Sequence, residues 1–380
     1  MSAQVCRPKV IWIHAVSVGE VNAAMPLLKQ LSEDYLEHQI VLSTTTMDGA
    51  KIVRDRLSNS VTHVYLPFDV PFFISRFLNK VKPVIFIMIE TELWPNLLLD
   101  CKRRSIPAVV VNARLSDKSL KSYQGVQCIS GHMMSNLSLV LARSNWDADN
   151  FVSLGLSRER VQVVGNIKFD NKFVLDVIDH SASDSRSEHR LTVCFGSVHE
   201  GELEILSDVM SQLRNKFPAL QFVYAPRHPA KLKRHTSHLR SRGIHFASGD
   251  YRAYLRRDRA LDVFVVDSLG ELLKFYSVSD VAFVGGSLVP LGGQNLLEPI
   301  SVGVPVVTGS SLYNFQEIAD ALISLNILAS VSDASSITQE ISYLLEEEHT
   351  REARSLRGRE WLTSKEGATQ RTVDALSVFL

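Results

Sequence analysis

The sequence predicts an α/β fold with two doubly wound parallel sheets. Short apolar runs alternate with stretches of helical periodicity along the chain of 380 residues. The apolar runs are continuous, a pattern that is typical of parallel strands covered by helices on both faces. A polar segment without periodicity, 177–190, interrupts this alternation. We therefore expect one Rossmann-like domain at 1–176 and a second at 177–380.

In the first domain, β-rich runs and amphipathic stretches follow one another in regular order. Strands are expected at 10–15, 39–46, 61–67, 83–90, 107–114, 137–144 and 160–166. Helices with apolar residues at three- and four-residue spacing are expected at 21–35, 47–57 and 71–82. This spacing fits right-handed strand–helix–strand units within one parallel sheet.

The same alternation restarts after the polar segment. Strands are expected at 191–197, 220–228, 244–248, 261–268, 281–287 and 304–310, and from about residue 334 the chain is helical and charged. Doubly wound sheets bind ligands at the carboxyl ends of their strands. Two such domains facing each other form a cleft there, so polar residues that directly follow strands are the candidates for function.

Composition excludes several classes of function. The chain is 45% hydrophobic and 22% charged, with 41 basic and 41 acidic side chains, so net charge gives no case for nucleic-acid binding. Four scattered cysteines without a CxxC pair indicate neither a zinc site nor a disulfide framework, and a reducing, cytosolic setting is expected. The start has no apolar segment typical of a signal peptide. The apolar run at 84–89 is far shorter than the ~20 residues that a membrane span needs.

Three charged side chains follow strands of the first domain. Glu20 ends the stretch "HAVSVGE", and it is either a catalytic base or a helix cap together with Ser17. Gly19 is expected to let the backbone turn sharply and present this carboxylate. Glu90 ends the apolar strand in "MIETELWPN", as a functional carboxylate in a desolvated place or again as a cap. Lys168, in "GNIKFD", is a candidate at the cleft or an ordinary solvated lysine.

The second domain offers two candidate ligand-binding stretches. In "APRHP", Arg227 follows a strand and has the planar donor fork that suits phosphate or carboxylate. In 283–299, two glycine pairs flank a loop before the "NLLEP" helix, whose first amides are expected to stabilise a phosphate. Glu298 is a candidate partner for ribose hydroxyls. The stretch is neither a Walker A motif nor G-x-G-x-x-G.

Two other polar clusters are interpreted as structural. The acidic pair in "DAD", 147–149, reads as the start of a short helix rather than a metal site. The "HTSH" stretch, 235–238, lies in a basic helix that is expected to present a solvated face.

Taken together, these segments resemble the 3-deoxy-D-manno-octulosonic acid (Kdo) transferases of lipopolysaccharide biosynthesis, which are two-domain glycosyltransferases of the GT-B type. The resemblance covers nearly the whole chain, and several of its stretches are six or more residues long, so it is more specific than a shared fold. The matching stretches, in family order, are "HAVSVGE", "STTT", "VYLPFD", "IMIETELWPN", "NARLS", "GNIKFD", "HEGE", "APRHP", "SLGEL", "FVGGSLV" and "GGQNLLEP".

The resemblance implies that the chain moves Kdo from CMP-Kdo onto a lipid A precursor, with inversion and with no metal or other cofactor. It implies that Glu20 is the general base and that Glu90 and Lys168 stabilise the transition state. The CMP contacts that it implies are Pro226, Arg227, Leu269, Gly270, Glu271, Asn295, Leu296, Leu297 and Glu298. Another GT-B transferase or a sugar-nucleotide epimerase that uses a UDP-sugar is the alternative, as is an inactive fragment.

Two departures from the family pattern concern the membrane and the donor loop. Family members usually begin with an apolar anchor, whereas the first strand is expected here at about residue 9, so either the start is truncated or contact with the cytoplasmic face of the inner membrane is peripheral. The stretch 71–82 mixes aromatic, aliphatic and basic residues, and it either touches an anionic membrane or packs on the sheet as an ordinary helix. "GGQNLLEP" differs slightly from the commoner "GGHNPLEP", and its backbone roles are expected to survive.

Overall fold

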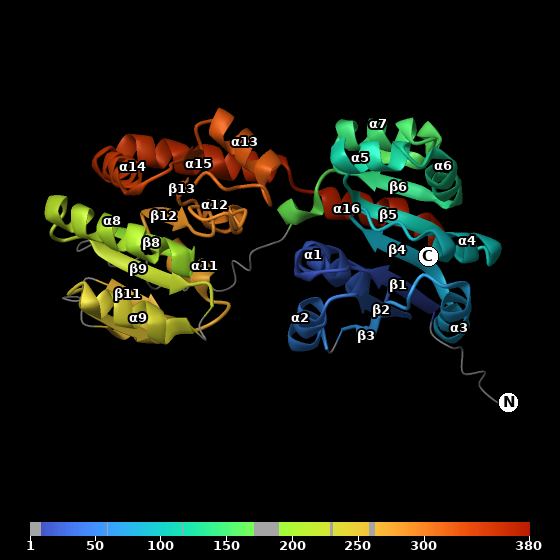
Figure 1. Ribbon diagram of the computed structural model, residues 1–380, viewed down its shortest axis with the longest axis horizontal. Coiled ribbons are helices and arrows are strands. Elements are labelled where there is room, and N and C mark those ends of the chain that lie inside the picture. Colours follow the sequence, from blue (N-terminus) through green and yellow to red (C-terminus); the bar gives the residue numbers. More distant parts are fainter. Residues whose placement is uncertain (1–8, 59, 116, 171–189, 229–230, 258–262) are drawn as a thin grey trace. The chain divides into compact units, whose positions relative to one another are not determined.

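The computed structural model describes residues 9–58, 60–115, 117–170, 190–228, 231–257 and 263–380. The chain forms two compact units, which are described here one at a time (Figure 1). Unit 1 comprises Met1–Lys172 and Lys365–Leu380, and unit 2 comprises Phe173–Ser364.

Unit 1 is built on a parallel sheet of seven strands in the order β3-β2-β1-β4-β5-β6-β7. Its strands are β1 (Lys9–His14), β2 (His38–Thr44), β3 (Thr62–Tyr65), β4 (Pro83–Ile89), β5 (Ala108–Ala113), β6 (Leu139–Ala142) and β7 (Val161–Val163). Its helices are α1 (Val18–Asp34), α2 (Met47–Leu57), α3 (Pro71–Val81), α4 (Pro95–Arg103), α5 (Asp117–Gln124), α6 (Gln127–Asn136), α7 (Asn145–Ser153) and α16 (Ala368–Leu376), with 3-10 turns η1 (Arg158–Arg160), η2 (Ile167–Asp170) and η8 (Ser377–Phe379).

Helices cover both faces of this sheet because successive strand residues point to opposite sides. On one face, Trp12 of β1 packs in a core with buried residues of α3, α4, α6 and α7. On the other face, Ile11 and Ile13 pack with buried residues of α1, α2 and α16. The continuous apolar run of β1 therefore serves two cores at once.

Unit 2 repeats this architecture with the strand order β10-β11-β9-β8-β12-β13-β14, again all parallel. Its strands are β8 (Thr192–Val198), β9 (Gln221–Pro226), β10 (Phe246–Gly249), β11 (Val263–Val266), β12 (Val281–Val284), β13 (Val306–Thr308) and β14 (Leu328–Ser330). Its helices are α8 (Leu203–Lys216), α9 (Leu232–Ser241), α10 (Tyr251–Arg256), α11 (Leu272–Ser277), α12 (Leu297–Ser301), α13 (Gln316–Ser324), α14 (Ala334–Glu346) and α15 (Glu348–Ser364), with the 3-10 turn η6 (Glu200–Glu202). Residues of α8, α9 and α14 pack on one face of the sheet, and residues of α10 and α11 pack on the other.

The predicted α/β class with two doubly wound sheets is confirmed. The expected domain limits, 1–176 and 177–380, differ from the two units at the end of the chain, where α16 returns to unit 1. The carboxylate of Asp170 accepts hydrogen bonds from the backbone N–H groups of Gly367 and Thr369, which ties this return to η2. Most of the segment interpreted as a linker, 177–190, lies outside the described residues. None of the described helices is long and apolar enough to cross a membrane.

Candidate active site

The strand order of unit 1 reverses between β1 and β4, which pair directly. In doubly wound sheets, the crevice beyond the carboxyl ends of two such strands is the usual ligand site. Glu20 follows β1 after a short turn, and Glu90 is the first residue after β4. The topology therefore brings both predicted carboxylates to the place in unit 1 where a ligand is expected.

Glu20 lies in the first turn of α1, where its Oε2 accepts a 2.6 Å hydrogen bond from the N–H of Val16. The carboxylate thus reaches back to the residue before the N-cap and satisfies a backbone donor there. Ser17 occupies the N-cap position, although its side chain makes no capping bond. Gly19 lies in the helix and is not among the residues with positive φ, so the sharp turn expected of it is wrong.

Burial raises the pKa of the Glu20 carboxyl to about 7. The hydrogen bond from Val16 opposes this shift, the charges of Glu90 and Glu92 add to it, and Lys168 lowers the pKa. Burial and the neighbouring Glu90 also raise the pKa of Glu92. A carboxyl that titrates near neutrality is suited to accept a proton at physiological pH.

Glu90 adopts a left-handed backbone, with φ of 65°, and its N–H donates to the carbonyl of Val111 on β5. Its Oε1 accepts a 2.7 Å hydrogen bond from Nζ of Lys168, which lies in η2. Both side chains are mostly buried, with exposed fractions of 20% for Glu90 and 30% for Lys168. The structure thus brings Glu20, Glu90 and Lys168 together, while their chemical roles stay predictions.

Asn112 is a supporting residue that sequence reasoning missed. It is the residue before the last of β5, has a left-handed conformation with φ of 55°, and is fully buried. Its Oδ1 accepts a 3.1 Å hydrogen bond from the N–H of Ile167, the residue before Lys168. Asn112 therefore fixes the turn that carries Lys168. It is the first residue of "NARLS", one of the stretches that carry the family resemblance, and this stretch was the signal that could have identified it.

His14 ends β1 and is fully buried. Burial lowers its pKa to about 4, so the imidazole is neutral at physiological pH. Its Nδ1 lies 2.9 Å from Oγ of Ser43 on β2, and Nε1 of Trp12 donates to the same hydroxyl at 2.9 Å. His14 therefore supports the end of the strand that leads to Glu20.

In unit 2, the corresponding reversal lies between β8 and β12. Glu202 follows β8 and is fully buried, and its two carboxylate oxygens accept backbone hydrogen bonds from His199, Gly286, Ser287 and Leu288. A Cβ on Gly285 would stand 2.7 Å from Oε2 of Glu202, so only glycine allows this approach. Glu202 thus anchors the glycine-rich loop. In the sequence, the one sign of this residue's importance was its place in the matching stretch "HEGE".

The predicted CMP contacts lie in three places at the carboxyl edge of this sheet. Pro226 ends β9, and the next residue, Arg227, donates from Nε to Oε1 of Gln294 at 3.1 Å. Leu269 is 72% exposed, and Gly270 has a φ of 81°.

Glu271, in the second of these places, is engaged by its own surroundings. Partial burial alone would raise its pKa, but hydrogen bonds from Ser268, Lys274 and the N–H of Tyr251 outweigh it and lower the pKa. This carboxylate is therefore ionised and held in place.

In the third place, Asn295 organises the start of α12. Its Oδ1 accepts from the N–H of Leu297 and its Nδ2 donates to Oε1 of Glu298, while Leu296 is buried. The helix has only five residues. Because a macrodipole needs aligned peptides over several turns, α12 gives weak support for the expected phosphate site at its N-terminus.

The two clusters interpreted as structural have different outcomes. Asp147 is buried and accepts from the N–H of Leu115, whereas Asp149 pairs with Arg158 at the surface, so the "DAD" stretch is the start of α7 as expected. The solvated face expected for "HTSH" is wrong at His235, which is buried with Nδ1 2.8 Å from the Tyr224 hydroxyl.

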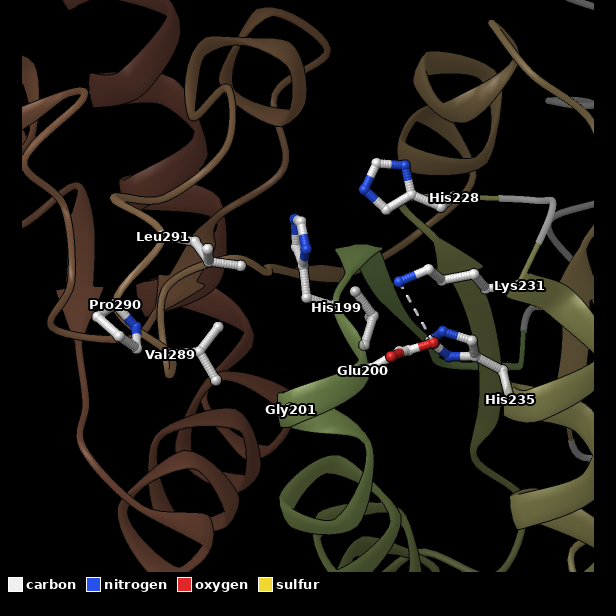
Figure 2. Close-up of a pocket in the computed structure, with 10 residues that line it drawn as sticks. His199, Glu200, Gly201, His228, Lys231, His235, Val289, Pro290 and Leu291 are labelled. Atoms are coloured by element: carbon white, nitrogen blue, oxygen red, sulfur yellow. Dashed lines mark ion pairs between the residues drawn. The ribbon is translucent and has the colours of Figure 1, made fainter.

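A pocket of about 280 Å³ lies beside His235 at the reversal point of unit 2. Figure 2 shows the apolar segment 289–291 on one side and His228, Lys231 and His235 on the other. His199 and its neighbours in the turn after β8 lie between them.

The chain is similar to known proteins over nearly its whole length. The family model for 3-deoxy-D-manno-octulosonic-acid transferase (kdotransferase) matches residues 2–171. A 3-deoxy-D-manno-octulosonic acid transferase of Haemophilus influenzae is 37% identical over 98% of this chain and 88% of its own length. The corresponding enzyme of Bordetella pertussis is 31% identical over 97% of this chain and 87% of its own length.

Solved structures resemble the chain at lower identity. UDP-GlcNAc 2-epimerase from Neisseria meningitidis, bound to UDP-GlcNAc, is 17% identical, with a TM-score of 0.65 over 97% of this chain and 99% of its own. A glycosyltransferase from Rickettsia africae is 11% identical, with a TM-score of 0.60 over 98% of this chain and 99% of its own. At such identities the likeness concerns the fold alone.

Proposed function

This chain belongs to the 3-deoxy-D-manno-octulosonic acid (Kdo) transferase family, and on that premise we propose that it transfers Kdo from CMP-Kdo to a lipid A precursor. It is thus a glycosyltransferase, and the donor, the acceptor and the mechanism are the proposed part. One observation carries the proposal best. The Glu20 carboxyl, with a pKa of about 7, lies within electrostatic reach of the Glu90–Lys168 pair where the strand order of unit 1 reverses.

In the proposed reaction, Glu20 takes the proton of a sugar hydroxyl on the acceptor. The hydroxyl oxygen forms a bond to the anomeric carbon of Kdo while the bond from that carbon to the phosphate oxygen breaks. The bonding electron pair leaves with CMP, and attack from the opposite face inverts the configuration. A positioned base of this kind contributes about 10²–10⁴-fold to the rate.

The anomeric carbon gains oxocarbenium character as the phosphate departs. We assign Glu90 to the stabilisation of this positive charge, and Lys168 to orienting the Glu90 carboxylate through the hydrogen bond between them. The 2.7 Å hydrogen bond between them and their mostly buried setting support this assignment. Preorganised charges in a poorly solvated place act more strongly than the same charges in water.

On the donor side, we assign CMP to the carboxyl edge of unit 2, with the implied contacts at 226–227, 269–271 and 295–298. Arg227 supplies the cation for the departing phosphate, since a guanidinium can bind two phosphate oxygens at once. We propose that this charge takes the place that a metal ion fills in other transferases.

The decisive experiment is mass analysis of the product made from CMP-Kdo and a lipid A precursor. We expect addition of Kdo, with CMP release that depends on the acceptor. Glu20→Gln should lower kcat by about 10²–10⁴-fold, whereas the surface control Glu33→Gln should keep wild-type turnover. Turnover of UDP-GlcNAc in place of CMP-Kdo would instead favour a sugar-nucleotide epimerase and would refute the proposal.

We also propose peripheral contact with the cytoplasmic face of the bacterial inner membrane through α3. Ile74 and Leu78 pack in the core, while Phe72 and Phe73 are 66% and 47% exposed. Arg76 lies on the same helix and is exposed. Exposed aromatic and basic side chains on one helix suit an anionic bilayer surface. Wild-type chain should sediment with vesicles that contain anionic phospholipid, Phe72→Ser/Phe73→Ser should remain in the supernatant, and equal sedimentation would refute this contact.

A further inference from the structure

We infer that the pocket beside His199 and Lys231 in unit 2 binds the sugar-acid part of the donor, with its carboxylate held by Lys231. This inference rests on the proposed function and deepens it, because it assigns a subsite to the sugar rather than to CMP. It concerns residues outside the implied contacts at 226–227, 269–271 and 295–298.

The position of the pocket favours a ligand. Its walls come from the turn after β8, from the start of α9 and from the loop after β12. The strands β8 and β12 are the two between which the order of the sheet reverses. Loops that diverge at such a point leave the crevice in which doubly wound folds bind their ligands.

The pocket is also next to the residues assigned to the nucleotide. His228 follows Arg227 directly, and the ring of His199 lies 3.3 Å from Nε2 of Gln294. Gln294 in turn accepts the hydrogen bond from Arg227 and precedes Asn295. In CMP-Kdo the sugar is attached directly to the phosphate, so a sugar subsite must adjoin the phosphate contact.

The size of the pocket fits one sugar. Its volume, about 280 Å³, is near the lower end of the ~300–1,000 Å³ that small-molecule sites occupy. A complete sugar nucleotide would need more space. The pocket can therefore take the sugar while the nucleotide lies on the neighbouring loops.

The charges on the walls favour an anion. Glu200 is the acidic side chain of the pocket, and it has two cationic partners, Lys231 at 3.6 Å and Arg234 at 3.3 Å. The distance to Lys231 is an ion-pair distance rather than that of a hydrogen bond, so the ammonium can turn its donors to a second carboxylate.

The other acidic side chain near this turn does not cancel that charge. Glu202 is fully buried, and both of its carboxylate oxygens accept hydrogen bonds from backbone N–H groups. Arg227 adds a further cation at the adjoining loop. In CMP-Kdo the carboxylate is attached to the anomeric carbon, which is linked through oxygen to the phosphate, so the carboxylate is at the end of the sugar that would lie nearest to these cations.

The remaining walls match the rest of such a sugar. The segment 289–291 provides an apolar surface opposite Lys231 (Figure 2), which suits the deoxy methylene and the C–H groups of Kdo. The imidazoles of His199 and His228 lie edge to face, 5.6 Å apart between ring centroids, and offer polar atoms to sugar hydroxyls. A pocket with one apolar wall and several convergent polar groups is typical of small-molecule sites.

The test is titration calorimetry of the full chain with CMP and with CMP-Kdo. The variant Lys231→Met should bind CMP as the wild type does and bind CMP-Kdo about tenfold more weakly, since it loses a charge-assisted contact to the sugar alone. Lys233→Met, an exposed lysine two residues further along the same helix, is the matched control and should change neither affinity. Leu291→Trp, which narrows the pocket from its opposite wall, should act like Lys231→Met.

The outcomes separate this inference from the proposed function. If the wild type binds both ligands and neither pocket variant weakens CMP-Kdo, the inference fails and the proposed function stands. If Lys231→Met weakens CMP and CMP-Kdo equally, the lysine binds the phosphate and the sugar subsite is refuted. If the wild type binds neither ligand, the proposed function and the inference fail together.

Discussion

Nζ of Lys168 lies 2.7 Å from Oε1 of Glu90, and this ion pair joins η2 to the end of β4. Each partner also acts on the carboxyl of Glu20, with opposite sign: Glu90 raises its pKa and Lys168 lowers it. Burial is the largest cause of the raised pKa of Glu20, and the two charges of the pair adjust that pKa further.

Replacing Lys168 and replacing Glu90 should shift the pH dependence of turnover in opposite directions. Lys168→Met removes the charge that lowers the pKa of Glu20, so the acidic limb of the kcat profile should move to higher pH. Glu90→Gln removes a charge that raises this pKa, so the limb should move to lower pH. Both variants should also lose about 10²-fold or more in kcat, because each removes a charge that is proposed to act in the transition state.

These shifts are measured from kcat between pH 5 and 9 at saturating donor and acceptor. Lys51→Met, an exposed lysine of α2, is the control and should keep the wild-type profile. Shifts in the same direction for both variants would show that the titrating group is not Glu20.

Glu20→Gln should stabilise the protein at high pH. A glutamate carboxyl ordinarily has a pKa of 4.5, whereas the pKa of Glu20 in the folded protein is about 7, so the folded state keeps its proton where the unfolded state has released it. The free energy of unfolding therefore falls as pH rises from about 4.5 to about 7. Glutamine has no proton to release and avoids this loss. At pH 8 the variant should therefore have a free energy of unfolding higher by on the order of 1 kcal/mol, a figure already reduced for screening by solvent.

At pH 4 the glutamate is mostly protonated in both states, so Glu20→Gln and the wild type should have nearly equal stability. Urea unfolding at the two pH values measures the difference. A variant that is less stable than the wild type at pH 8 would contradict the raised pKa.

Asn112 should matter for both stability and turnover, since it holds the backbone before Lys168 by the bond to Ile167. Asn112→Ala removes this acceptor and also leaves an alanine at a φ of 55°, a left-handed conformation that asparagine tolerates better. A loss of about 2 kcal/mol in the free energy of unfolding is expected. Asn112→Gly removes the same acceptor without the steric strain, so it should lose less.

Both variants should lower kcat because both release the turn that carries Lys168. Chemical denaturation gives the stabilities, and steady-state assays with CMP-Kdo give kcat. Wild-type kcat in Asn112→Gly would show that the hydrogen bond to Ile167 is not needed to position the lysine.

Glu202→Gln should destabilise unit 2. The carboxylate accepts four backbone N–H bonds, two on each oxygen, whereas a glutamine offers one oxygen and turns two donors toward the remaining N–H groups. A cost of about 3 kcal/mol or more is expected for leaving buried donors unpaired. CMP affinity should fall as well, because the anchored loop leads to Asn295.

Glu204→Gln provides the matched control for this variant, since Glu204 is exposed on the following turn. It should unfold at the same denaturant concentration as the wild type. Equal unfolding midpoints for Glu202→Gln and the wild type would contradict the anchoring role.

The strands were predictable because buried parallel strands are continuous apolar runs, as in β4, whose residues Ile85–Ile89 are fully buried. The strand β14 (Leu328–Ser330) was not expected, because its three residues, "LAS", include one large apolar side chain. The edge strand β7 (Val161–Val163) is equally short, but it lies in the apolar run "RVQVVGN" and was expected.

The supporting contacts of the site could not be read from the sequence. Asn112 bonds to a residue 55 positions away and Glu202 to one 86 positions away, so no local pattern reports either pairing. Strand ends could be located, and with them Glu20 and Glu90. The left-handed backbone at Glu90 and Asn112 was not foreseen, because neither residue is a glycine.

The return of α16 to unit 1 has a consequence for biosynthesis. Val373 and Leu376 of α16 belong to the same core as Ile11 and Ile13 of β1, whereas unit 2 is one continuous stretch. The nascent chain can therefore complete unit 2 before α16 has been synthesised, and the part of unit 1 that is made first waits for this helix until unit 2 has been made.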